Sequence, residues 1–104
     1  MSMRIFTPRS ARECAGTILP VARLMRRLFR DMVNSRDGAG NLEGPVDRAY
    51  FALVEGFRSA VGRIEAEGVR IQNPHTGFLD FPAMREGRQV VLCWSIDEPS
   101  VAYW

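Results

Sequence analysis

Hydrophobic residues in the first third of the chain recur at the spacing of an α-helix. Their positions advance by steps of 3, 4, 3 and 4, which places them on one helix face; they are Ile18, Val21, Met25, Leu28 and Met32. Thr7 and Pro8 are typical of a helix start, because a hydroxyl caps free N–H groups and proline suits the first helical position. Three glycines and a proline in residues 35–45 end the pattern. We therefore predict a helix over residues 7–35, kinked at Pro20, which cannot donate a regular helical hydrogen bond.

A second helical pattern follows the glycine-rich segment. Its apolar positions advance by steps of 4, 3, 4, 3 and 4 and are Val46, Tyr50, Leu53, Phe57, Ala60 and Ile64. Pro45 opens this segment, and Gly68 follows it at a place where helices commonly end. The pattern predicts a second helix over residues 45–67. Two successive helices with matching apolar stripes and one connecting loop are expected to pack as an antiparallel hairpin.

The second half of the chain changes to the pattern of a β-sheet. Four short segments are rich in β-branched and aromatic residues and are separated by turn signals; they are residues 69–72, 77–81, 88–96 and 100–104. Loops as short as these join antiparallel neighbours. We predict an α+β fold in one domain, residues 1–104, in which an antiparallel two-helix hairpin packs on a three- to four-stranded antiparallel meander sheet formed by residues 69–104.

The third predicted strand is apolar on both of its faces. Val90, Leu92 and Trp94 alternate with Val91 and Cys93, and a strand of this kind is typical of the centre of a sheet covered on both sides. The helical hairpin can cover one side. A second copy of the chain is the simplest cover for the other side, so we expect a homodimer.

Composition excludes several classes of protein. No apolar run approaches the ~18 residues of a membrane span, and Met1–Phe6 lacks the apolar core of a signal peptide. We therefore expect a cytoplasmic protein with no membrane contact. Cys14 and Cys93 are far apart and outside any CxxC spacing, which favours reduced thiols. With one histidine and no cysteine cluster, the sequence predicts no structural zinc and no cofactor.

Positive charge is concentrated at the start of the chain. The sequence has no lysine, and residues 1–36 hold eight arginines against two acids, whereas the remainder holds six arginines against ten acids. Such a distribution suits an anionic partner, or pairing of one half of the chain with the other.

The C-terminal half also resembles a known family. The segments Asp80-Phe81-Pro82-Ala83, Gly87-Arg88, Leu92-Cys93-Trp94 and Tyr103-Trp104 are similar to those of small prokaryotic proteins grouped as domain of unknown function 2203. Phe6-Thr7, Leu19-Pro20 and Gly68-Val69 extend the resemblance over nearly the whole chain, whereas Asp97 stands where the family commonly has a glycine. The resemblance implies a small bacterial protein of two helices and a sheet, and it implies no substrate.

One set of polar and aromatic residues could bind a small molecule or an anion. Its members are Asp80, Arg85, Arg88, Trp94 and Glu98. A strand carboxylate beside an arginine-bearing turn could act as a general base or as half of an anion clamp. The interpretation we favour is structural: Asp80 accepts backbone N–H groups or pairs with Arg88 across the hairpin, which would fix the strand register. Glu98 is expected to be a turn acid.

Two further candidates receive structural interpretations. A catalytic Cys93 would need a group that lowers its pKa, and the only imidazole is that of His75, in the turn 73–77, so we expect a buried core thiol. The basic positions of the first helix could contact nucleic acid; they are Arg23, Arg26, Arg27 and Arg30. No recognition motif accompanies them, so we favour a solvated face that pairs with acids of the second helix, such as Glu43, Asp47 or Glu55.

Three functions remain open from the sequence. The leading hypothesis is a non-enzymatic, self-associating interaction or structural module. The second is binding of a small molecule or anion, with or without catalysis, through Asp80 and Arg88. The third is nucleic-acid binding through the arginines of the first helix.

Overall fold

The computed structural model describes residues 4–39 and 45–98. Within them the chain forms two helices and three strands, in the order α1 (Pro8–Ala39), α2 (Pro45–Ala66), β1 (Arg70–Asn73), β2 (Phe78–Arg85) and β3 (Arg88–Ser95). The expected strand at residues 100–104 lies outside the described residues. The predicted α+β fold is confirmed, since two helices pack on a three-stranded antiparallel sheet.

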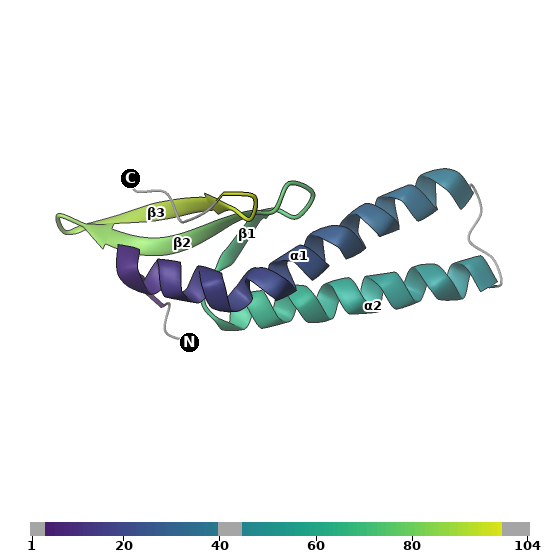
Figure 1. Cartoon of the computed structure of the whole chain (residues 1–104), viewed down its shortest axis with the longest axis horizontal. Coiled ribbons are helices and arrows are strands. Elements are labelled where there is room, and N and C mark those ends of the chain that lie inside the picture. Colours follow the sequence, from purple (N-terminus) through teal and green to yellow (C-terminus); the bar gives the residue numbers. More distant parts are fainter. Residues whose placement is uncertain (1–3, 40–44, 99–104) are drawn as a thin grey trace.

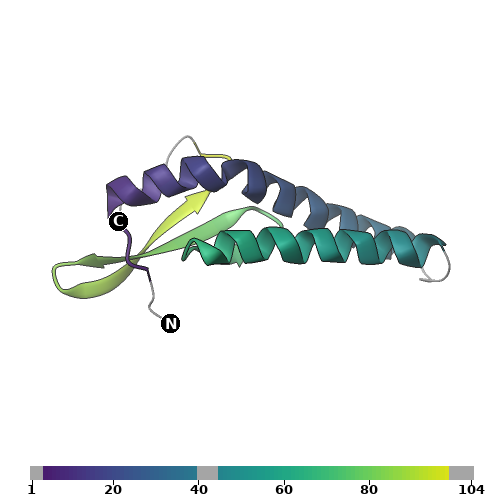
Figure 2. The ribbon, with the colours of Figure 1, turned by 90° about the horizontal axis from the view of Figure 1, so that it is seen from below.

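The two helices lie side by side and run in opposite directions (Figure 1). The sheet packs against one end of the helical pair, and the rest of the pair extends beyond it, so that the molecule measures 54 × 29 × 21 Å. A view turned by 90° shows the strands in the space between the separated helix ends (Figure 2). Core and helical extension are therefore distinct parts of one elongated molecule.

Helix α1 begins where the sequence predicts and ends later. The backbone N–H of Ser10 donates to Thr7 Oγ1 at 3.0 Å, and that of Thr7 donates to Ser10 Oγ at 2.9 Å, so the two residues cap the helix reciprocally. The helix continues to Ala39 rather than ending at residue 35. Glycine costs an established helix only about 1 kcal/mol, so Gly38 does not stop it. Figures 1 and 2 both show α1 changing direction in its first half, where Pro20 lies.

The strand order β1-β2-β3 corrects one expectation. β2, not β3, is central, and β3 lies at an edge of the sheet formed by the described residues. One face of β3 is covered, since Leu92 and Trp94 are 1% and 3% exposed, but Val91 on the other face is 45% exposed. The single chain thus leaves this second face of β3 partly exposed.

Pro82 lies inside the central strand because its missing N–H is not needed there. Its carbonyl accepts a hydrogen bond from the backbone N–H of Phe6 at 2.6 Å, on the side of β2 away from β3. The N and C=O of one strand residue point to the same side, so the proline ring replaces no donor to β3. The segment before α1 thereby adds a short parallel bridge, Phe6 to Ala83, beside β2.

The β2–β3 connection is shorter than the six-residue turn predicted at 82–87. Arg85 pairs with Arg88, which leaves only Glu86 and Gly87 in the loop. Both have positive φ, 51° and 78°, the backbone requirement of a type I′ hairpin turn. This location of the turn sets the register of the whole hairpin.

The hydrophobic core lies between the sheet and the proximal ends of the helices. α1 contributes small side chains, among them Ala11, Ala15 and Ala22, which let the helix approach the sheet closely. Aromatic rings fill the space between the layers. The ring centroid of Phe81 lies 5.1 Å from that of Phe6, in an edge-to-face contact, and 6.3 Å from that of Trp94. Such contacts contribute beyond the area that they bury.

The part of the helical pair beyond the sheet has no comparable core. We name this part the helical arm and define it as residues 26–35 of α1 and 48–59 of α2; none of these residues is fully buried. Its apolar stripe is only half-buried and consists of Leu28, Phe29, Met32, Tyr50, Leu53, Val54 and Phe57. Val33 and Phe51 are 38% and 58% exposed. Two helices alone therefore leave much of this stripe in contact with water.

Candidate functional site

The polar and aromatic residues singled out in the second half of the chain do not form one site. Leu79 of β2 pairs with Trp94 of β3, and both are buried against the helices. Asp80 is on the opposite face of the same sheet, because neighbouring strand residues alternate. Arg85 and Arg88 lie at the far end of the hairpin, beside its turn. No pocket surrounded by Asp80, Arg88 and Trp94 follows from this arrangement.

The predicted pairing of Asp80 with Arg88 is wrong. Asp80 lies directly opposite Cys93, and Arg88 lies opposite Arg85. The Cys93 thiol is 3.4 Å from Asp80 Oδ1 and 3.4 Å from Gln72 Oε1. Asp80 thus accepts a hydrogen bond from a thiol on the face of the sheet that is turned away from the helices.

Cys93 is half-buried on this face rather than part of the core. Its partial burial raises its pKa, and the hydrogen bond to Asp80 and the negative charges of Asp80 and Glu98 raise it further; the backbone hydrogen bond at Trp94 opposes them. The neighbouring carboxylate therefore keeps the thiol protonated, which is the opposite of what nucleophilic catalysis requires. Cys14 is buried, and its pKa is also raised, mainly by burial.

Glu98 is a turn acid, as the sequence suggests. Its Oε1 accepts a hydrogen bond from the backbone N–H of Ser95 at 3.0 Å. Its backbone carbonyl accepts one from Trp94 Nε1 at 3.2 Å. Both contacts hold the turn after β3, and the second also satisfies the indole N–H of the buried tryptophan.

Two of the four arginines considered for nucleic acid hold the fold together. Arg26 Nη1 donates to both carboxylate oxygens of Asp97, at 2.9 and 2.8 Å, and Arg30 Nε donates to the carbonyl of His75 at 3.1 Å. The acid that pairs with Arg26 therefore comes from the turn after β3, not from α2. Arg23 and Arg27 are exposed.

His75 has a structural position. Its exposed ring lies edge to face with Phe29, with ring centroids 6.0 Å apart, and Phe29 stacks in turn on Phe57 at 5.6 Å. The turn between β1 and β2 thus packs against the base of the helical arm.

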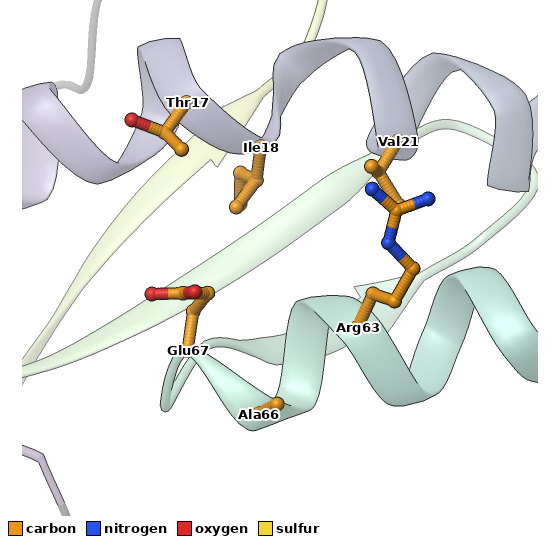
Figure 3. A pocket seen from close by; sticks show the side chains of 6 residues that line it. All are labelled: Thr17, Ile18, Val21, Arg63, Ala66 and Glu67. Atoms are coloured by element: carbon orange, nitrogen blue, oxygen red, sulfur yellow. The ribbon is translucent and has the colours of Figure 1, made fainter.

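A surface hollow of about 270 Å³ lies between the two helices at the end that covers the sheet. α1 contributes Thr17, Ile18 and Val21, and α2 contributes Arg63, Ala66 and Glu67. Figure 3 shows Arg63 and Glu67 extending from α2 into the space that Ile18 and Val21 face from α1. Ile18 is only 4% exposed. The hollow is therefore apolar between the helices and charged along α2.

The two charged side chains at this hollow, those of Glu67 and Arg63, differ in whether an opposite charge lies beside them. Arg4 Nη1 is 3.4 Å from Glu67 Oε2 and also donates to the Glu67 carbonyl at 3.2 Å, and the Arg4 guanidinium lies 4.3 Å from the centroid of the Phe6 ring. Glu67 is thus compensated by a fixed cation. Among the residues that the structure describes, Arg63 has no such carboxylate partner. One positive charge remains at the hollow.

The hollow is absent from the sequence-based predictions. Arg63 and Glu67 are four positions apart on a helix, which is the usual spacing of an exposed ion pair, and nothing in that spacing indicates a cavity. The hollow depends on how far the two helices separate as they pass over the sheet, and this distance is a property of the tertiary structure.

Potential metal ligands are not clustered in the described residues 4–39 and 45–98. These residues include no group of three or more histidine, cysteine, aspartate or glutamate side chains placed to hold a metal ion. Neither of the two described helices combines the length and the apolar character that a membrane crossing demands.

The fold and these surfaces define a small α+β protein with a protruding helical arm. The family model described as "Uncharacterized conserved protein (DUF2203)" matches residues 4–104, nearly the whole chain. The protein belongs to this family, as the resemblance in its C-terminal half implied. No curated protein and no solved structure matches the chain.

Proposed function

We propose that the protein is a non-enzymatic module that self-associates through its helical arm. The observation that carries this proposal is the amount of surface that the single chain leaves exposed. The solvent-accessible surface is 6812 Å², whereas a compact monomer of 11.7 kDa exposes about 5,900 Å². The excess is roughly 900 Å² per chain.

This excess is the size of a protein–protein interface. Stable specific interfaces bury about 800 Å² on each partner. The radius of gyration supports the same conclusion, since it is 15.9 Å, against about 13 Å for a compact chain of this length. Both quantities support the proposal that a partner covers part of this elongated chain.

We assign this excess surface mainly to the arm. Its apolar stripe is half-buried, and Phe51, at 58% exposed, is the most exposed large hydrophobic side chain of the described residues. Pairing two such arms would form a four-helix bundle, in which the stripes of all the helices face a common core. A second copy of the chain is the appropriate partner, because a two-fold interface places the same apolar surface on both sides.

The sheet face turned away from the helices is the alternative interface. It carries Phe78, Met84 and Val91, which are 36%, 46% and 45% exposed. We expect burial of these side chains to account for less of the excess surface than burial of the arm. The arm extends along the longest dimension of the molecule (Figure 1). One experiment distinguishes the two surfaces.

The test measures mass in solution by sedimentation equilibrium between ~5 and ~200 µM, a range that brackets dissociation constants of tens of micromolar. We expect the unchanged protein to be a dimer and Phe51→Glu to be a monomer, because a charge in an apolar bundle core is strongly unfavourable. Met84→Glu is the matched control on the sheet and should remain a dimer. Dimer loss only in Met84→Glu would assign the interface to the sheet, and an unchanged protein that is monomeric throughout would contradict self-association.

A further inference from the structure

We propose that the hollow between α1 and α2 is a binding site for a short aliphatic monocarboxylate. The site is formed by Ile18 and Val21 from α1, and by Arg63 and Ala66 from α2. It lies where residues 17–21 of α1 pass residues 63–67 of α2, outside the helical arm (Figure 3). The inference is independent of self-association.

The size of the hollow limits the ligand. An apolar cavity of about 150 Å³ accepts benzene, whereas sites for drug-sized ligands have about 300–1,000 Å³. A volume of about 270 Å³ is between these, so a ligand of six to ten non-hydrogen atoms is the expected class (roughly, from the same comparison). A nucleotide or a peptide is too large to be enclosed.

The apolar lining indicates the body of the ligand. Ile18 is almost fully buried beneath the hollow, Val21 is half-buried beside it, and the exposed Ala66 of α2 lies at its rim. The Thr17 hydroxyl donates to the Glu13 carbonyl at 3.1 Å, so its proton is already used within the helix. The central surface of the hollow thus favours a hydrocarbon chain, whose burial is worth about 0.8 kcal/mol per CH₂ in principle.

The charges decide the sign of the head group. A zwitterion would need both Arg63 and Glu67, but Glu67 already interacts with Arg4, which the Phe6 ring also holds in place. A cationic ligand would have to displace Arg4 from Glu67 and would also meet Arg63. Arg63 is the charge left without compensation, and a planar carboxylate accepts two parallel N–H bonds from a guanidinium. A monocarboxylate with a hydrocarbon chain matches both the apolar lining of the hollow and the positive charge of Arg63.

The experiment is an NMR titration of the ¹⁵N-labelled full chain with sodium hexanoate up to 20 mM, at constant ionic strength. We expect saturable shifts of the amide signals around the hollow, those of Ile18, Val21 and Ala66, with a Kd on the order of 1 mM, as befits one exposed charged contact and a short chain. Hexanamide has the same apolar body without the charge and should bind at least fivefold more weakly.

Variants test the role of each part. Arg63→Gln should weaken hexanoate binding at least fivefold, whereas Arg23→Gln, which changes an exposed arginine of α1 outside the helical arm, should leave it unchanged. Ala66→Leu places a larger side chain in the hollow and should also weaken binding. The amide spectrum of each variant shows directly whether it is folded.

Three results would overturn the proposal. The first is the absence of saturation by 20 mM hexanoate in the unchanged protein. The second is equal binding of hexanoate and hexanamide, and the third is unchanged affinity in Arg63→Gln. Because these measurements follow individual amide signals, they give the same answer whether the chain is a monomer or a dimer.

Discussion

Asp80 and Cys93 face each other across the central and edge strands, with Asp80 Oδ1 3.4 Å from Cys93 Sγ. Burial raises the pKa of the Cys93 thiol, and the hydrogen bond and negative charge of Asp80 raise it further. A thiol in this setting is protonated at neutral pH and reacts slowly, because the thiolate is the nucleophile. The pair therefore contributes to the sheet as a hydrogen-bonded contact and not as a reactive centre.

Replacing the carboxylate should make Cys93 more reactive. In Asp80→Asn the negative charge is lost, so the pKa of Cys93 should fall and alkylation by iodoacetamide at pH 8 should quicken about threefold or more, as the thiolate fraction grows. Glu86→Gln, which removes an exposed acid of the hairpin turn, should leave the rate unchanged. Peptide mapping by mass spectrometry separates Cys93 from Cys14. A Cys93 rate that is the same in Asp80→Asn would contradict the influence of the carboxylate.

The raised thiol pKa values also predict how stability depends on pH. Burial is the main reason why the pKa of both Cys14 and Cys93 is raised in the folded chain, so the folded state binds their protons more tightly than the unfolded state. This contribution is complete below the unfolded thiol pKa of ~8.5 and is lost as pH rises through the higher folded values. Urea midpoints should therefore fall between pH 8.5 and 10.5. Cys93→Ala should show a shallower fall, and an identical slope would count against the raised pKa of Cys93.

The Asp80–Cys93 pairing shows why the sequence did not predict the register. Reading residues 82–87 as the turn brings Asp80 close to Arg88, because Pro82 looks like the end of a strand. The actual turn contains only Glu86 and Gly87, which moves the pairing by four residues. Pro82 could remain in the strand because Phe6, 76 residues earlier, hydrogen-bonds to its carbonyl, and such a long-range contact leaves no local sequence signal.

Phe6 should therefore be important for stability although it lies outside the named helices and strands. It is 1% exposed, packs edge to face on Phe81 and connects the N-terminal segment to β2. Phe6→Ala should lower the free energy of unfolding by about 3–5 kcal/mol, the usual cost of removing a buried aromatic side chain. The adjacent Ile5 is 45% exposed, and Ile5→Ala should cost less than about 1 kcal/mol. Urea unfolding followed by tryptophan fluorescence measures both, and equal losses would contradict the anchoring role of Phe6.

Other features of the fold were predictable because they depend on local spacing. The 3.6-residue period located both helices to within a few residues, and the Thr7 cap is formed as expected. The faces of β3 were assigned correctly, and the single chain leaves the face with Val91 and Cys93 partly exposed, as an apolar side chain can be at a sheet edge or an interface. The hollow beside Arg63 depends on the separation of two helices and has no counterpart in residue spacing.

The Arg26–Asp97 ion pair should couple α1 to the turn after β3. Arg26 is 17% exposed and Asp97 is 69% exposed, so solvent screens the pair from one side, and we expect a coupling free energy of roughly 0.5–1 kcal/mol. A double-mutant cycle of Arg26→Gln and Asp97→Asn, measured by urea unfolding, gives this value directly. The coupling should shrink at 1 M NaCl. Additive effects of the two substitutions would show that the contact contributes nothing to stability.

Gly77 is a position at which the structure should tolerate substitution poorly. Its φ is +79°, and an added Cβ would lie 2.7 Å from Cγ1 of the buried Ile96, whose backbone N–H donates to the Gly77 carbonyl. Gly77→Ala should therefore combine left-handed backbone strain of about 1–2 kcal/mol with displacement of a packed side chain, for a total of roughly 3 kcal/mol. Gly87 provides the matched control, since its φ is +78° but nothing lies within 4 Å of an added Cβ; Gly87→Ala should show the backbone strain alone. Thermal and urea unfolding of both variants test the difference, and equal destabilisation would mean that Ile96 moves aside without cost.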